Sequence, residues 1–194
     1  MKNYLNELPE NYKVVYCLNA KNVKTGIIFN VFALLILLIA AIAGFPLIKN
    51  INIFNINPFR ILLFLLILIF ALIVLIFSNP LLHSLIIFIF TGRKLKFGIT
   101  WSCVYCGIPD IYLNKKTVLA ASIIPFFISS AIITVFLIFI TDLRIKYFIL
   151  LNLSLNIGMY LGDLYVLFLF LFRFKGNVLV KDVGPEEYFY SDKI

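Results

Sequence analysis

The feature that most constrains this chain is an uncharged stretch, Ile61–Gly92, in which His83 is the single ionisable side chain. As one straight helix it would be about 48 Å long, whereas the hydrocarbon core of a bilayer is about 30 Å thick. Pro80 lies in the middle of the stretch and removes a backbone hydrogen bond there. We therefore predict a span at about 61–91 that is kinked at Pro80. The alternative is two separate pieces, of which the second is re-entrant.

The rest of the composition agrees with a membrane protein. Hydrophobic residues make up 63% of the 194 residues and charged residues 13%, which excludes an ordinary soluble domain. We predict an all-α integral membrane protein with about four transmembrane helices, forming a single membrane domain over residues 1–194. The predicted spans are residues 26–48, 61–91, 117–140 and 147–172, followed by a cytosolic tail at 173–194.

Three polar segments outside these spans have strand-like patterns. Residues 12–18 alternate with a period of two, and Leu95–Ile99 and Cys103–Tyr105 can pair as a hairpin. The tail has a turn signal at Gly184-Pro185 between two short strand candidates, Asn177–Lys181 and Tyr188–Tyr190. We predict a small cytosolic β element from the N-terminus, the central loop and the C-terminal tail. The aromatic tail is interpreted as a strand pair and not as a ligand site.

Charge sets the orientation and the partners. The formal net charge is +8. With four crossings, the side that holds both termini and the central loop carries 13 lysines and arginines, against 4 on the other side. Cationic loops stay in the cytoplasm, so both termini are predicted to be cytoplasmic. The expected partner is the lipid bilayer, and no nucleic-acid binding is expected because the basic residues are scattered over short loops.

Two ionisable side chains lie within the predicted spans, His83 and Asp163. Asp163 continues a series of polar residues at helical spacing, which places them on one helix face: Asn152, Asn156, Tyr160 and Asp163. Ionisable groups in a membrane need partners, so we predict that His83 and Asp163 lie close together. The favoured interpretation is a hydrogen-bonded interior pair, and the alternative is a metal site.

The three cysteines are Cys17, Cys103 and Cys106. Cys103 and Cys106 form a C-x-x-C pair, which can be half of a zinc site or a redox pair. A structural zinc site needs four ligands, and the sequence offers no second pair. Two reduced cysteines at the membrane interface are therefore the favoured interpretation.

Several short motifs, in order along most of the chain, carry a family resemblance. They are LPENYKVVY at Leu8–Tyr16, NPLLHSLII at Asn79–Ile87, KFG at Lys96–Gly98, YC at Tyr105-Cys106, Pro125, GDL at Gly162–Leu164, and VKDVGPEEYFY at Val180–Tyr190. In these the chain resembles a family of small bacterial membrane proteins described as "putative zincin peptidases", which look like minimal site-2-type intramembrane metalloproteases. The resemblance implies a bacterial cell membrane as the location.

It also implies a zinc site made by H-E-x-x-H on one helix and an acid on a later helix. Two histidines at i and i+4 reach one metal, and the glutamate activates water. Here the first histidine is His83 and the distal acid is Asp163, so these two would be vestigial metal ligands. Ser84 occupies the glutamate position and Ile87 the second histidine position. Serine is too weak a base for this role, and isoleucine cannot bind zinc.

These departures lead to two functional hypotheses. The first is a catalytically inactive pseudo-protease without a cofactor, which binds a membrane protein or peptide partner. The alternative is an active intramembrane zinc metallopeptidase with a non-standard ligand set, such as His83, Asp163 and a loop cysteine. A transporter subunit has little support, because the sequence shows no internal repeat.

Overall fold

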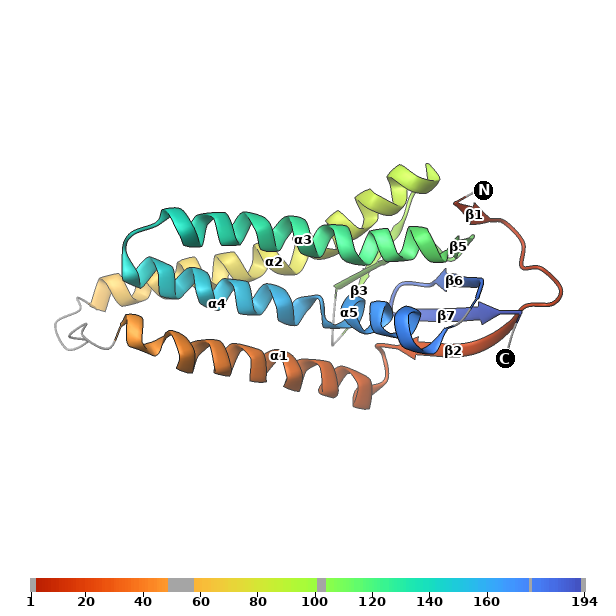
Figure 1. Cartoon of the computed structure of the whole chain (residues 1–194). Helices are drawn as coiled ribbons and strands as arrows, with labels where there is room; N and C mark the ends of the chain where they lie inside the picture. Colours follow the sequence, from red (N-terminus) through yellow and green to blue (C-terminus); the bar gives the residue numbers. More distant parts are fainter. Residues whose placement is uncertain (1–2, 49–57, 101–103, 175, 193–194) are drawn as a thin grey trace.

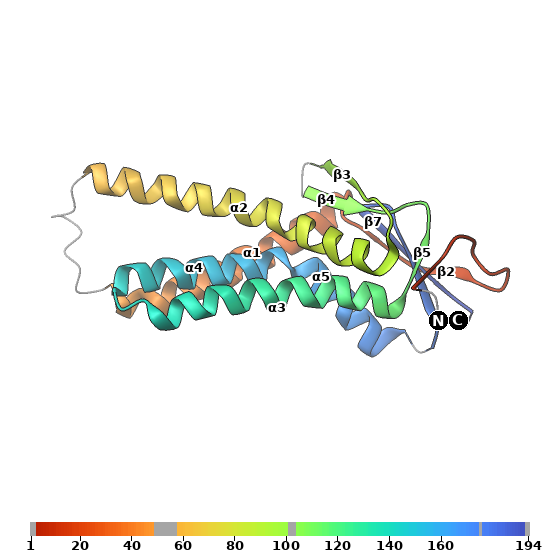
Figure 2. The same cartoon turned by 90° about the horizontal axis from the view of Figure 1, so that it is seen from above.

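In a computed structural model, which describes residues 3–48, 58–100, 104–174 and 176–192, a helix bundle carries a β-sheet at one end (Figure 1). The helical elements are α1 (Val23–Gly44), the 3-10 turn η1 (Phe45–Leu47), α2 (Pro58–Thr91), α3 (Lys115–Phe139), α4 (Leu143–Met159), α5 (Leu161–Phe168) and the π-helical turn η3 (Leu169–Arg173). Helix α1 packs on α4, α4 on α3, and α3 on α2. Both chain ends lie at the sheet end of the bundle, as Figure 2 also shows.

Polar side chains fix where three of the helices begin. Asn22 caps α1, Asn114 caps α3 and Asp142 caps α4, each accepting a hydrogen bond from a backbone N–H in the first turn. Such caps satisfy amide groups that have no partner within the helix. The sequence therefore marks the start of these three helices locally.

Within the described residues, three helical segments are long and apolar enough to cross a membrane: Val23–Leu47, Ile69–Thr91 and Lys115–Phe139. A fourth crossing is possible if α4 and the segment Leu161–Arg173 form one span, which bends by 50° at the break between them. The last predicted span is therefore not one straight helix. Helix α2 runs through Pro80 without interruption and changes direction near its middle (Figure 1), as expected for a kinked helix and not for two separate pieces.

The predicted all-α fold class is wrong, because the described residues also form two β-sheets. The larger one is antiparallel with the strand order β1-β5-β6-β7-β2, and β3 pairs with β4 in a separate hairpin. The strands are β1 (Tyr4–Leu5), β2 (Lys13–Asn19), β3 (Lys96–Ile99), β4 (Val104–Gly107), β5 (Tyr112–Asn114), β6 (Val178–Asp182) and β7 (Glu186–Ser191). The N-terminus, the central loop and the tail all contribute strands to the larger sheet. The central loop does so through β5, which the sequence patterns did not reveal.

The hydrophobic core lies at the junction of the sheet and the helix ends. Phe189 and Val180 of the sheet, Ile87 of α2 and Val166 of α5 are almost completely buried there. Along the bundle, in contrast, many large apolar side chains of α1, α2 and α3 are exposed, as on a surface that faces lipid. This core packs the sheet against the helix ends, where the candidate site lies.

Candidate functional site

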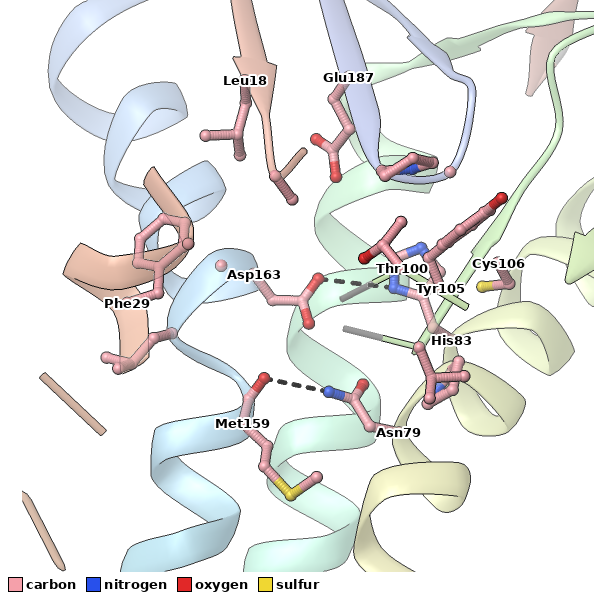
Figure 3. A pocket seen from close by; sticks show the side chains of 18 of the residues that line it. Leu18, Phe29, Asn79, His83, Thr100, Tyr105, Cys106, Met159, Asp163 and Glu187 are labelled. Atoms are coloured by element: carbon pink, nitrogen blue, oxygen red, sulfur yellow. Dashed lines mark hydrogen bonds and ion pairs between the residues drawn. The ribbon is translucent and has the colours of Figure 1, made fainter. Parts of the chain in front are cut away.

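A cavity of about 540 Å³ opens where the sheet meets the ends of the helices (Figure 3). Its lining comes from α1, α2, the break between α4 and α5, and the strands β2, β3, β4, β6 and β7. Its polar and ionisable side chains include Asn79, His83, Cys106, Asp163, Asp182 and Glu187. The described residues of the lining include no lysine or arginine.

A helix break and a proline kink shape one wall of this cavity. Helix α4 ends at Met159, and the carbonyl oxygen of Met159 accepts a hydrogen bond of 3.2 Å from the side-chain amide of Asn79. Asn79 directly precedes Pro80 in α2, so the hydrogen bond ties the kink of one helix to the break of the other (Figure 3). Buried backbone carbonyls need such partners, and the tie fixes the two helices that carry His83 and Asp163.

His83 and Asp163 face each other across this wall. Nδ1 of His83 lies 3.5 Å from Oδ1 of Asp163, and each side chain is 15% exposed (Figure 3). The predicted proximity of the two residues is confirmed. Each provides the partner that an ionisable group at this depth requires.

The other members of the predicted polar face do not line the cavity. The amide of Asn156 donates to Oγ of Ser130 in α3 at 3.0 Å, and Asn152 bonds the carbonyl of Phe148 one turn earlier in its own helix. Tyr160 is 2% exposed and packs edge-on against Phe126 of α3. Asn156 and Tyr160 thus link the end of α4 to α3, and beyond the bend at Tyr160 only Asp163 of the four residues lines the cavity.

Ser84 and Ile87, which occupy the positions of the glutamate and the second histidine of a zincin motif, lie outside the cavity. The hydroxyl of Ser84 donates to the carbonyl oxygen of Leu81 in its own helix at 2.8 Å. Ile87 has no exposed surface and belongs to the hydrophobic core. Neither residue lines the cavity, so α2 contributes His83 as its only ionisable side chain there.

Sequence reasoning missed two acids that the tail brings to the site, Asp182 and Glu187. They are directly opposite each other in the antiparallel pair of β6 and β7. A signal was present in the alternation: Asp182 shares a strand face with Val178 and Val180, which are buried, and Glu187 shares one with Phe189. The turn between them needs Gly184, which has a φ of 100° and packs against the ring of Tyr105.

Electrostatics in the cavity disfavour negative charge on these acids. Burial raises the pKa of Asp182 to about 6, although His83 opposes this rise. Burial also raises the pKa of Glu187 to about 8, and repulsion from Asp182 and Asp163 adds to the effect. Burial likewise raises the pKa of the Cys106 thiol, so this cysteine is a poor nucleophile and a poor metal ligand as it stands.

A zinc ion does not fit the donor arrangement in the described part of the chain. That part contains no group of three or more His, Cys, Asp and Glu side chains placed to hold a metal. Cys106 is buried and free, whereas Cys103, its predicted partner in the C-x-x-C pair, lies outside the described residues. The alternative ligand set of His83, Asp163 and a cysteine therefore lacks support among the described residues.

Comparison with known proteins gives one finding. A family model described as "Putative zincin peptidase" matches residues 72–178, more than half of the chain. No curated protein and no solved structure matches significantly. The matched region includes His83, Cys106 and Asp163 and ends before Asp182 and Glu187.

Proposed function

The chain belongs to the family described as "Putative zincin peptidase", and from this premise we propose that it is a catalytically inactive member that binds a peptide segment of a membrane partner. The proposed loss of activity rests on one observation: α2 presents His83 to the cavity without the glutamate and second histidine that zinc-dependent hydrolysis requires. Hydrolysis at a catalytic zinc needs three protein ligands, an open position and a base that activates water. Ser84 and Ile87 supply neither the base nor the ligand.

The cavity supports the binding role. Its volume of about 540 Å³ is in the range of pockets that enclose a small-molecule ligand, roughly 300–1,000 Å³, and is large enough for the side chains of a short peptide. Apolar residues such as Leu18, Phe29 and Met159 line it beside the polar ones. A pocket of mixed character next to membrane-spanning helices suits a segment that leaves the bilayer.

We place the protein in the bacterial cell membrane as a multi-pass protein with both termini in the cytoplasm. The cation asymmetry of the loops supports this orientation. The sheet lies at the same end of the bundle as both termini (Figure 1), so the cavity would open near the cytoplasmic surface. A partner would present the cytoplasmic end of a transmembrane segment to it.

Zinc content and proteolysis of the detergent-purified protein test the proposal. We expect far less than one zinc per chain after incubation with zinc and desalting, and no chelator-sensitive cleavage of membrane-peptide substrates. His83→Ala serves as the control, because every zinc site that the family motif allows here uses His83. Stoichiometric zinc that this substitution removes, together with chelator-sensitive cleavage, would overturn the proposal and restore the active-enzyme alternative.

A further inference from the structure

We propose that the cavity binds a primary ammonium group, that of a lysine side chain in the bound peptide, with Asp163, Asp182 and Glu187 as its acceptors. The inference rests on the proposed binding function and names the chemistry that the pocket recognises. The three carboxylates come from three elements, α5, β6 and β7, and the described lining offers them no lysine or arginine. His83 is the one basic side chain among them.

The strand register points to a missing positive charge. Asp182 and Glu187 are directly opposed across β6 and β7, where two charges of the same sign are unfavourable, so both acids can be ionised together only beside a positive charge. The preceding residue of β7, Glu186, lies outside the cavity, and its carboxylate pairs with Lys21 at 3.3 Å. Lys21, just after β2, therefore compensates the outer acid, whereas the described lining offers no lysine or arginine to the inner pair.

One oxygen in the cavity has no partner at all. Oδ1 of Asp182 accepts the backbone N–H of Gly184 at 2.8 Å, and Asp163 has His83. Oε2 of Glu187 is buried without any hydrogen-bond partner, the sole such side-chain atom in the described part of the chain. Figure 3 shows the Glu187 carboxylate pointing from the sheet into the cavity, towards Asp163. A buried carboxylate oxygen without a donor is costly, so a donor belongs there.

The geometry favours an ammonium group over a metal ion or a guanidinium group. A metal needs ligand atoms about 2 Å away, and no group of three donors in the described residues is placed to hold one. An ammonium group donates up to three hydrogen bonds of about 2.8 Å, so its acceptors can stand farther apart. Asp163 and Asp182 each already use one oxygen within the protein, which leaves single acceptors instead of the paired oxygens that a guanidinium fork prefers.

The remaining lining fits the rest of a lysine side chain. Leu18, Phe29 and Leu161 are apolar and line the same cavity, where the four methylene groups of lysine can pack while the ammonium group reaches the acids. Transmembrane segments carry lysines at their cytoplasmic ends. A lysine that follows a partner's membrane span is therefore the source that the position of the cavity favours, and a free small amine is the competing source of the same group.

Isothermal titration calorimetry of the full-length protein in detergent at pH 8.5, above the pKa of Glu187, tests the inference. The probes are Nα-acetyl-lysine methylamide, its uncharged norleucine analogue and n-butylamine. We expect the lysine probe to bind at least ten times more tightly than the norleucine analogue. Tighter binding of the lysine probe than of n-butylamine identifies a peptide source, whereas equal binding keeps the ammonium site and overturns the peptide source.

Matched variants locate the site. Glu187→Gln and Asp182→Asn should each weaken binding of the lysine probe at least tenfold. Glu186→Gln removes the same charge from the neighbouring residue outside the cavity and should leave binding unchanged. Equal binding of the lysine and norleucine probes, or unchanged binding in both cavity variants, would overturn the inference.

Zinc content and chelator-sensitive cleavage are measured on the same sample. A protein without zinc or activity that does not bind the lysine probe would contradict the ammonium site alone. A protein with zinc and proteolytic activity would contradict the proposed function.

Discussion

Glu187 links the protonation of the cavity to the stability of the fold. Its pKa is about 8 in the folded protein, mainly through burial, against an ordinary value of 4.5. The charged and titratable groups that face it are Asp182 from β6, Asp163 from α5, His83 from α2 and Cys106 from β4. Between the two pKa values the folded protein holds a proton that the unfolded chain releases, so the free energy of unfolding falls as the pH rises from about 5 to 8.

We therefore predict that the protein melts at a higher temperature at pH 6 than at pH 9 in detergent, and that Glu187→Gln flattens this dependence. One proton corresponds to on the order of 1 kcal/mol per pH unit. Glu186→Gln is the matched control, because the hydrogen bond from Tyr188 and the partner Lys21 lower the pKa of Glu186. An equally steep loss of stability in Glu187→Gln would show that other groups cause it.

The contact between His83 and Asp163 makes a second prediction at this scale. Each side chain is 15% exposed and the two lie 3.5 Å apart, so replacing one leaves the other poorly solvated and without its partner. We expect Asp163→Leu alone to lower the melting temperature more than Asp163→Leu combined with His83→Leu. Thermal unfolding of both single variants and the double variant measures this coupling. Strictly additive effects would mean that the pair has no energetic coupling.

At the scale of elements, two glycines near the helix break play different parts. A Cβ atom on Gly158 of α4 would lie 2.9 Å from the Cβ atom of Ala33 in α1, whereas one on Gly162 of α5 would have no such neighbour within 4 Å. Gly158 thus permits the close approach of α1 and α4, and Gly162 is replaceable.

We predict that Gly158→Ala destabilises the protein and that Gly162→Ala is neutral or stabilising. Alanine is favoured over glycine within helices by roughly 0.5–1 kcal/mol, so the second variant reveals the gain that the crowding at Gly158 cancels. Thermal unfolding of the two variants, side by side, gives the comparison. Destabilisation by Gly162→Ala of the same size would contradict the assignment of the close contact to Gly158.

Most of the helices and strands could be predicted from sequence patterns, but the bend between α4 and α5 and the strand β5 could not. The uncharged runs allowed the long helices to be predicted, and the strand-like patterns of residues 12–18 and of the tail allowed β2, β6 and β7 to be predicted. The bend at Tyr160 was missed, because residues 147–172 are apolar on both sides of it. The short strand β5 carries too few residues for a periodic signal.

The sequence allowed two of the four charged residues of the candidate site to be predicted. His83 and Asp163 stood out because a charge inside an apolar run is rare. Asp182 and Glu187 belong to a segment rich in polar residues, so the sequence does not distinguish them from acids on the surface. Their burial depends on the register of β6 against β7 and on the packing of the sheet against the helices, which are long-range features.

At the scale of the whole molecule, the sheet, the cavity and both chain ends gather at one end of the helix bundle (Figure 2). With an even number of crossings this end faces a single side of the membrane. The bent pair of α4 and Leu161–Arg173 is therefore decisive, because the number of crossings is even only if this pair forms one span. The cytoplasmic side that we propose for this end rests on the loop cations.

The exposed Cys17 in β2 tests this orientation in living cells. We predict that a membrane-impermeant maleimide fails to label Cys17 in intact cells and labels it after permeabilisation, in a variant in which Cys103→Ser and Cys106→Ser leave it as the only cysteine. Partial burial raises the pKa of the Cys17 thiol, so the reaction is run at pH 8. The permeabilised sample shows that the thiol is reactive.

Asn52→Cys, in a background without other cysteines, is the control for the opposite side. It lies in the loop between the first two predicted spans and should be labelled in intact cells. Labelling of Cys17 in intact cells, with Asn52→Cys protected, would invert the orientation and place the cavity outside the cytoplasm.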